Sequence, residues 1–323
     1  MDRTMMYKSE WFRRIVGAGA VWLFVSVLAF TLGALAPGDP AQIILLRRNG
    51  EAPSETDVRA LRLELGLNDP APQRYARWVR GALVGDFGTS YRTGQPVFAE
   101  LRARAQASLL LASVALLVGM AVAVPMALLS VAHRGATIDR LLRVAALTGI
   151  SIPSYLVAYV LILIFAVRFR MLPAAGAGDL RHALLPALTL GLVSAAGLSR
   201  ILRANLLDEV NSPYMRTALA KGVSGWKALV RHALRNALNP LVTIGALRFG
   251  RILGEAVIIE TVFAWPGVGL WTVAAIYDRD YPAIQAFMLF VATLFIVINL
   301  LVDVAYGFID PRVRVGALTT ARS

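Results

Sequence analysis

The sequence predicts an all-α polytopic membrane protein with six transmembrane helices. Hydrophobic residues make up 57% of the 323 residues and charged residues only 16%. The mean hydropathy is +0.62, and a water-soluble globule of this length could not bury so much apolar surface. The apolar residues also gather in long uncharged runs, which match the roughly 20 residues that a helix needs to cross a bilayer.

Five uncharged runs are long enough, or nearly so, to cross the membrane. They are residues 15–36, 105–132, 144–167, 182–199 and 281–302. A sixth span at 238–262 is needed to connect the fourth run with the last, although Arg248, Arg251 and Glu255 interrupt it. The first run is too long for the apolar part of a signal peptide and no small-residue cleavage site follows it, so we expect it to remain as an anchor.

Arginine and lysine residues at the span ends predict the orientation. If the N-terminus lies inside, the basic clusters at the N-terminus, after the second span and between Arg200 and Arg235 all face the cytoplasm. Short cytoplasmic loops are enriched in such residues. We therefore expect both termini in the cytoplasm, and we attribute the net charge of +13 to topology rather than to nucleic-acid binding.

This topology divides the chain into four parts. Residues 1–36 form the N-terminus and first span, 37–104 an extracytoplasmic layer, 105–310 the core with a cytoplasmic loop at 206–240, and 311–323 a cytoplasmic tail. In the layer, helical patterns at 54–65 and 72–83 precede the turn-rich stretch GDFGTSYRTGQPV. The layer is either a lid on the outer helix ends or a docking surface for a soluble partner.

The sequence contains no arrangement of residues that is typical of an enzyme active site. The chain has no cysteine, and it contains no Walker A, GxGxxG, HExxH or GxSxG motif. His133, His182 and His232 are far apart in sequence, each near a membrane boundary, where interfacial packing is expected rather than metal ligation. We expect no catalytic residue, no metal site and no bound cofactor in this chain.

A basic segment without any acidic residue lies between the predicted spans at 182–199 and 238–262. Its sequence is YMRTALAKGVSGWKALVRHALRNALNP. Ser212 and Pro213 form a helix start, Gly222 can take a positive φ and end that helix, and Ser224 can cap a second one. Each helix is too short to span the membrane. The residues alone leave two interpretations open, a docking element for another protein or an amphipathic helix on anionic lipid.

Several motifs, taken in order, resemble a known family. They include LAPGDPA, ELGLNDP, GDFGTSYRTGQPV, LLPALTLGL, YMRTALAKGVS, ETVFAWPGVG, RDYPAIQ and NLLVDVAYGFIDPRVR. The chain is similar over nearly its whole length to the permease subunit of bacterial peptide and nickel ATP-binding-cassette importers. This resemblance implies the type I importer permease fold in the bacterial inner membrane.

The resemblance also implies a coupling helix that fits into a groove of an ATPase subunit. Its residues are Tyr214, Arg216, Thr217, Ala218, Lys221 and Gly222. Arg216 stands where other importer classes have Glu, and Pro240 falls later than their usual proline. The segment RTALAKG is similar to the version in peptide permeases.

Partners follow from the same resemblance. They are a second, homologous permease subunit in a heterodimer, two ATPase subunits that bind ATP and Mg, a periplasmic substrate-binding protein and membrane lipid. The expected cargo is a peptide, a nickel chelate, or an opine-like or other carboxylate-bearing compound.

Charged residues inside the sixth span are candidates for the translocation path, because such residues are costly in a membrane. Arg248, Arg251 and Glu255 can lie along one helical stripe. The stripe either lines the path and favours carboxylate-bearing cargo, or Arg251 pairs with Glu255 while Arg248 faces the partner subunit. Further along, Glu260, Trp265, Pro266 and Gly267 are expected to shape an outer gate, with interfacial anchoring by Trp265 as the alternative.

Two other classes fit the sequence less well. A secondary transporter would need internal repeats or broken helices around a midplane ion site, and no repeat is visible. A membrane-embedded enzyme would need converging catalytic groups, whereas Ser151, Asn205 and Asn299 are isolated polar residues suited to helix packing.

Overall fold

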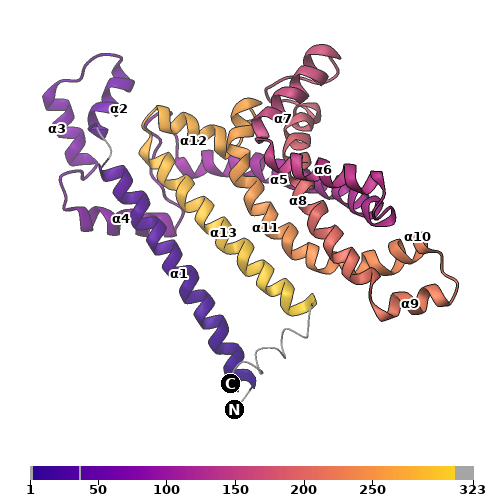
Figure 1. The fold of residues 1–323 in the computed structure, drawn as a ribbon. Helices are drawn as coiled ribbons and strands as arrows, with labels where there is room; N and C mark the ends of the chain where they lie inside the picture. Colours follow the sequence, from indigo (N-terminus) through magenta and orange to yellow (C-terminus); the bar gives the residue numbers. More distant parts are fainter. Residues whose placement is uncertain (1–2, 36–37, 310–323) are drawn as a thin grey trace. The chain divides into compact units, whose positions relative to one another are not determined.

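The computed structural model describes residues 3–35 and 38–309, and these residues are almost entirely helical (Figure 1). They form two compact units. Unit 1 comprises Met1–Gln106 and Trp271–Ile296, and unit 2 comprises Ala107–Leu270 and Val297–Ser323. The predicted cytoplasmic tail at 311–323 lies outside the described residues.

Four helices contain apolar stretches long enough to cross a membrane. They are α1 (Arg3–Leu35), α5 (Val97–Ala132), α8 (Leu180–Val210) and α13 (Tyr281–Ile309). Each matches one predicted span and extends beyond it at one end or both, and residue 36, the predicted end of the first span, lies outside the described residues. Hydropathy marks the part of a helix that suits lipid, whereas the backbone hydrogen bonds continue into the polar flanks.

The third predicted span, 144–167, is not one straight helix. The structure has α6 (Thr137–Ser151), α7 (Ser154–Leu161) and a π-helical continuation η1 (Ile162–Arg168), with a bend of 107° between α6 and the α7–η1 pair. The break lies at Pro153, and the preceding Ile152 is extended at φ −81° and ψ 127°. Proline disfavours the helical conformation in the residue before it, so the expectation of an unbroken span was wrong.

The sixth predicted span is present as a helix, α11 (Leu234–Val262). Pro240 lies inside it. It holds five charged residues, Arg235, Arg248, Arg251, Glu255 and Glu260. It is not among the four clearly apolar helices, which become at most five if the bent α6–α7 pair is one span. That α11 crosses the membrane therefore stays a prediction.

Unit 1 holds the helices of the predicted extracytoplasmic layer. These are α2 (Pro40–Asn49), α3 (Glu55–Glu64) and α4 (Ala71–Leu83). The helical pattern predicted at 54–65 is confirmed by α3, which Ser54 caps: its hydroxyl accepts a hydrogen bond from the Asp57 amide at 3.2 Å. The sequence reading missed α2, which begins at a proline behind an Asp39 N-cap.

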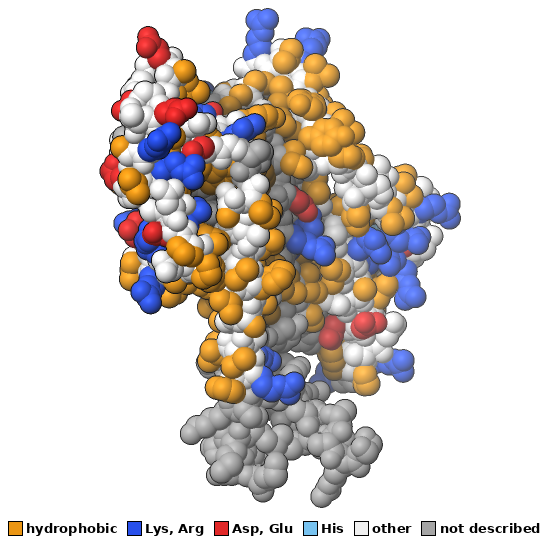
Figure 2. All heavy atoms as spheres, turned by 90° about the vertical axis from the view of Figure 1, so that its left-hand side faces the viewer, with side chains coloured by type: hydrophobic (Ala, Val, Ile, Leu, Met, Phe, Trp, Pro, Cys, Tyr) orange, Lys and Arg blue, Asp and Glu red, His pale blue; other side chains and the backbone are white. Residues whose placement is uncertain are grey.

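The surface of unit 1 changes in character along its length. Apolar side chains of α1 such as Phe12 and Phe24 are 68% and 69% exposed, as lipid contact would require. Figure 2 shows charged side chains of both signs over the α2–α4 region at the upper left, and many apolar side chains below it. The layer thus has the surface of a water-exposed element.

Unit 2 is built around α8. In the most apolar stretch of α8, 61% of the residues are buried, compared with 33% in that of α5. Glycines allow α5 and α8 to approach closely, since a Cβ added at Gly191 would lie 2.6 Å from the Val118 side chain and one at Gly119 would lie 3.1 Å from the Gly191 carbonyl. Small residues at such a crossing are the usual basis of helix association in membranes.

Candidate functional site

The predicted coupling element lies at one end of unit 2, directly after α8. Only Asn211 and Ser212 separate α8 from α9 (Pro213–Ala220), so the predicted helix start at Pro213 is confirmed. In Figure 1, α9 and α10 (Gly225–Ala228) form a hairpin at the end of α8 and α11.

The predicted helix end at Gly222 is also confirmed. Gly222 has φ +83°, its amide donates to the Leu219 carbonyl at 2.9 Å, and the Val223 amide donates to the Ala218 carbonyl at 3.2 Å. These two bonds define a Schellman motif, which requires a residue with positive φ at this place. The chain reverses sharply here because glycine adopts that conformation without strain.

The second helix of the element is not a separate short helix, as the sequence reading had it. Ser224 precedes α10, and α10 continues through the π-helical segment η2 (Leu229–Ala233) into α11. No glycine or proline interrupts the sequence between Gly225 and Pro240, so nothing ends the helix before it reaches α11. The segment therefore connects α9 to α11 by a continuous helical backbone.

Buried and hydrogen-bonded side chains fix α9 to its neighbours. Met215 is 2% exposed and belongs to an apolar cluster that includes Leu206 of α8 and Leu229 of η2. The Tyr214 hydroxyl donates to the Glu209 carboxylate and accepts from Asn236 Nδ2 at 3.1 Å. Burial, followed by the Glu209 carboxylate, raises the pKa of the Tyr214 phenol above its ordinary value.

The other predicted coupling residues leave a basic, accessible face. Arg216, Thr217 and Lys221 are exposed, and Ala218 is half-buried. The Thr217 hydroxyl donates to the Pro213 carbonyl at 3.1 Å, within its own helix. The arginine and lysine side chains are thus free to meet a partner, while Tyr214 and Met215 hold the helix in place.

Of the predicted path residues, the structure brings Arg248 and Glu255 together. Arg248 Nη1 lies 3.6 Å from Glu255 Oε1, and Arg248 Nε donates to the Ser194 hydroxyl of α8 at 3.3 Å. The ion pair of Glu255 is thus with Arg248 and not with Arg251, whose side chain is exposed, so the alternative of an Arg251–Glu255 pair was wrong. Spacings of four and of seven residues both place side chains on one face of a helix, so spacing alone does not choose between the two arginines. The Glu255 carboxylate points toward Arg248.

Glu255 has spare bonding capacity. Its Oε2 atom is buried and has no hydrogen-bond partner among the described residues. A buried carboxylate oxygen without a donor is costly. This atom could accept a hydrogen bond from an ammonium or amide group of a passing solute.

The predicted gate residues form a closed clasp. The Glu260 side chain is fully buried, accepts from the Ser108 hydroxyl at 2.5 Å, and accepts from the Gly269 amide at 2.7 Å. It thereby caps the first turn of α12 (Val268–Tyr277). A Cβ at Gly267 would overlap the Glu260 carboxylate, so glycine is required there for packing.

Trp265 belongs to the same clasp. It is 8% exposed, and its Nε1 donates to the Ala107 carbonyl at 3.2 Å. Interfacial anchoring needs a tryptophan whose polar edge reaches the headgroups, and this geometry does not provide one. The role of Glu260, Trp265, Pro266 and Gly267 as a gate stays a prediction.

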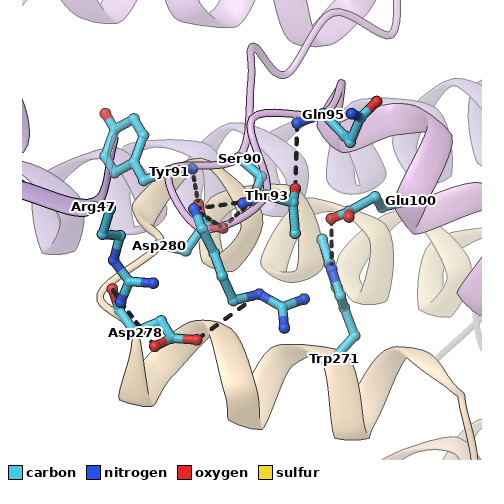
Figure 3. A network of polar contacts seen from close by, with 10 residues as sticks. Arg47, Ser90, Tyr91, Thr93, Gln95, Glu100, Trp271, Asp278 and Asp280 are labelled. Carbon is cyan, nitrogen blue, oxygen red and sulfur yellow. Dashed lines mark hydrogen bonds and ion pairs between the residues drawn. The ribbon is translucent and has the colours of Figure 1, made fainter. Parts of the chain in front are cut away.

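The sequence reading missed a polar network in unit 1 that holds the GDFGTSYRTGQPV loop (Figure 3). Asp280 is 1% exposed, and its carboxylate accepts from the Ser90 hydroxyl and from the Tyr91 amide, the latter at 3.0 Å. Asp278 pairs with Arg47 at 2.8 Å and lies 3.8 Å from Arg92 Nε. An aspartate directly before Tyr281 and Pro282 is a helix-start signal, and it could have drawn attention to Asp280.

Residues 115–315 match the family described as "Binding-protein-dependent transport system inner membrane component". The chain belongs to this family. Residues 8–112 match the corresponding N-terminal family of membrane components, so the two matches together extend over most of the chain.

Three relatives cover nearly the whole permease. A probable peptide ABC transporter permease of Sinorhizobium fredii is 38% identical over 94% of this chain and 98% of its own. A probable D,D-dipeptide transport system permease of Escherichia coli K12 is 36% identical over 90% and 93%. A glutathione transport system permease of Salmonella paratyphi A is 40% identical over 94% and 97%.

Proposed function

We propose that this permease forms half of the translocation path of an ATP-driven importer for peptides or related carboxylate-bearing solutes. The observation that carries the proposal is the continuity of α9 with two long helices, through two residues to α8 and through α10 and η2 to α11. The named cargoes of the relatives, peptide, D,D-dipeptide and glutathione, support this substrate class.

Energy enters this permease as movement, since its sequence has no phosphate-binding loop. Two ATPase subunits, which bind the ATP and Mg, close on ATP and displace α9 through the exposed Arg216 and Lys221. The packed Met215 and the Tyr214 hydrogen bonds transmit the displacement to α8 and α11. The helices α8 and α11 then move relative to each other as the path opens to the other side. The hydrogen bond between Ser194 of α8 and Arg248 of α11, at 3.3 Å, lies between the two moving helices.

The complex has further parts on this proposal. A second, homologous permease supplies the other half of the path, and a periplasmic binding protein delivers the solute to the layer at 37–104. Both termini and α9 lie in the cytoplasm of the bacterium. Because the chain has no native cysteine, single introduced thiols can test these positions.

Reconstituted transport is the deciding experiment. Proteoliposomes with both permeases, the ATPases and the binding protein should import peptide only when ATP is present. Uptake by this chain alone down an ion gradient would instead indicate a secondary transporter and would refute the proposal.

Crosslinking tests the coupling role separately. An Arg216→Cys variant of the assembled complex should crosslink to an ATPase subunit, whereas Arg181→Cys, at the opposite end of α8, should not. Labelling of Lys221→Cys by a membrane-impermeant maleimide from outside the cell would contradict the proposed orientation.

A further inference from the structure

A cavity of about 170 Å³ lies in unit 2 between α5, α6 and the half of α8 that leads to α9. Three arginines line it, namely Arg143, Arg200 and Arg203, and no acidic residue does. The rest of the wall is largely apolar and includes Met126, Leu142, Ala146 and Leu147. The cavity is therefore amphipathic, with a cationic part beside a hydrocarbon-like part.

A single carboxylate behind the wall holds two of the arginines. Asp139 is 1% exposed and lies 3.1 Å from Arg203 Nη2 and 3.5 Å from Arg143 Nε. The Ser130 hydroxyl accepts from Arg203 Nε at 2.7 Å and donates to Asp139 at 2.5 Å. Arg203 is thus fixed in position before any ligand arrives.

The arginines exceed the charge that Asp139 can balance. Arg200 makes no ion pair or hydrogen bond with any residue that the structure describes. With three guanidinium groups and one carboxylate, the site keeps an excess positive charge. Arginine suits phosphate oxygens because its planar donors can bind two of them at once.

The cavity also lies at the level where lipid headgroups are expected. The second predicted span ends at residue 132, two residues after Ser130. The third begins one residue after Arg143, and the fourth ends one residue before Arg200. The predicted ends of three apolar runs therefore meet at the cationic part of the wall.

We propose that this cavity binds the phosphate of an anionic phospholipid. The headgroup phosphate contacts Arg143, Arg200 and Arg203, and the first part of an acyl chain lies along Leu142 and Leu147. A free anion would make no use of this apolar wall. Assignment to the cytoplasmic leaflet rests on the proposed position of α9, whereas binding itself does not depend on the transport function. Basic pockets between helices on this side of a membrane are suited to such headgroups.

Native mass spectrometry of the full chain, released from detergent, can measure the binding. Phosphatidylglycerol should remain bound and phosphatidylcholine should not. An Arg143→Gln/Arg200→Gln variant should bind phosphatidylglycerol about thirtyfold more weakly, since each of the two basic residues contributes a factor of about five to six. Arg140→Gln is the matched control, an exposed arginine of α6 that does not line the cavity.

Several results would overturn the proposal. These are equal retention of the two lipids, an unchanged affinity in the double variant, or release of the lipid by excess inorganic phosphate, which would indicate a free-anion site. Arg200→Gln alone breaks no contact with a described residue, so it remains informative if the double variant fails to fold. Loss of lipid binding with intact ATP-driven import would leave the proposed function standing.

Discussion

The Tyr91 amide donates a hydrogen bond to Asp280 Oδ1 at 3.0 Å, which joins the loop before α5 to the turn between α12 and α13. The same carboxylate accepts from the Ser90 hydroxyl. It therefore organises donors that would otherwise be buried without a partner. Removing it should free the loop.

An Asp280→Ala variant should be destabilised by about 3 kcal/mol, because two hydrogen bonds to a buried carboxylate, from Ser90 and Tyr91, are lost together. Asp278→Ala is the control. Its ion pair with Arg47 has both side chains 34% exposed, and a pair of that kind contributes about 1 kcal/mol or less. Thermal unfolding and limited proteolysis of the loop measure both effects; equal losses in the two variants would contradict this account.

Tyr91 makes the folding stability of unit 1 depend on pH above about 10. Burial, and secondly the Asp280 carboxylate, raise the pKa of the Tyr91 phenol from 10.0 to about 12. The neutral phenol thus favours the folded state, so its contribution is complete below pH 10 and is lost as the pH rises towards about 12. We expect the wild type to lose on the order of 2 kcal/mol more than Tyr91→Phe over this interval. Parallel stability curves for the two proteins would exclude the effect.

The sequence predicted the elements whose signals are local. Runs of apolar residues located the helices α1, α5, α8 and α13, and the Ser212–Pro213 start and the Gly222 end set both limits of α9. Pro153 is also a local signal, for the bend between α6 and α7, but the span was assigned from the length of the uncharged run alone. The Asp280 network could not be predicted in this way, because its partners Ser90 and Tyr91 are about 190 residues away in sequence. The Arg248–Glu255 pair could not be predicted either, because Arg251 is also suitably spaced from Glu255 and only the side-chain conformations decide between the two arginines.

Gly222→Ala should weaken coupling between ATP hydrolysis and import. At φ +83° a side chain costs about 1–2 kcal/mol, so the turn after α9 should shift to relieve the strain. In the reconstituted complex we expect import per ATP to fall about fivefold to thirtyfold. Gly225→Ala is the matched control, because an added Cβ there meets no atom within 4 Å and the residue is helical. Equal coupling in both variants would remove Gly222 from the mechanism.

Gly267→Ala should open the Glu260 clasp. The added methyl group would overlap the carboxylate, and overpacking of this kind costs about 1–3 kcal/mol. Gly254→Ala, inside α11 where an added Cβ has open space, should instead stabilise the isolated chain by about 0.5–1 kcal/mol. Thermal unfolding of the two variants in the same detergent gives the comparison, and a stable Gly267→Ala protein would show that the clasp tolerates rearrangement.

Arg248 should determine preference for anionic cargo if it lines the path. Its removal in Arg248→Gln leaves Glu255 without its ion pair at 3.6 Å, and an unpaired carboxylate repels a carboxylate-bearing peptide. We expect import of an acidic dipeptide to fall about tenfold relative to a neutral one, which corresponds to roughly 1.4 kcal/mol. Glu255→Gln should shift the ratio in the opposite direction, because it removes the negative charge and leaves the arginine free.

Arg251→Gln provides the matched control for this measurement. Arg251 is exposed and lies three residues from Arg248 on the same helix, so its loss should leave the ratio of the two rates unchanged if it faces away from the path. Competition between labelled acidic and neutral dipeptides in one vesicle preparation gives the ratio directly and cancels differences in protein amount. Equal loss of both cargoes in Arg248→Gln would assign the Arg248–Glu255 pair to helix packing between α8 and α11, because breaking a packing contact impairs every substrate alike.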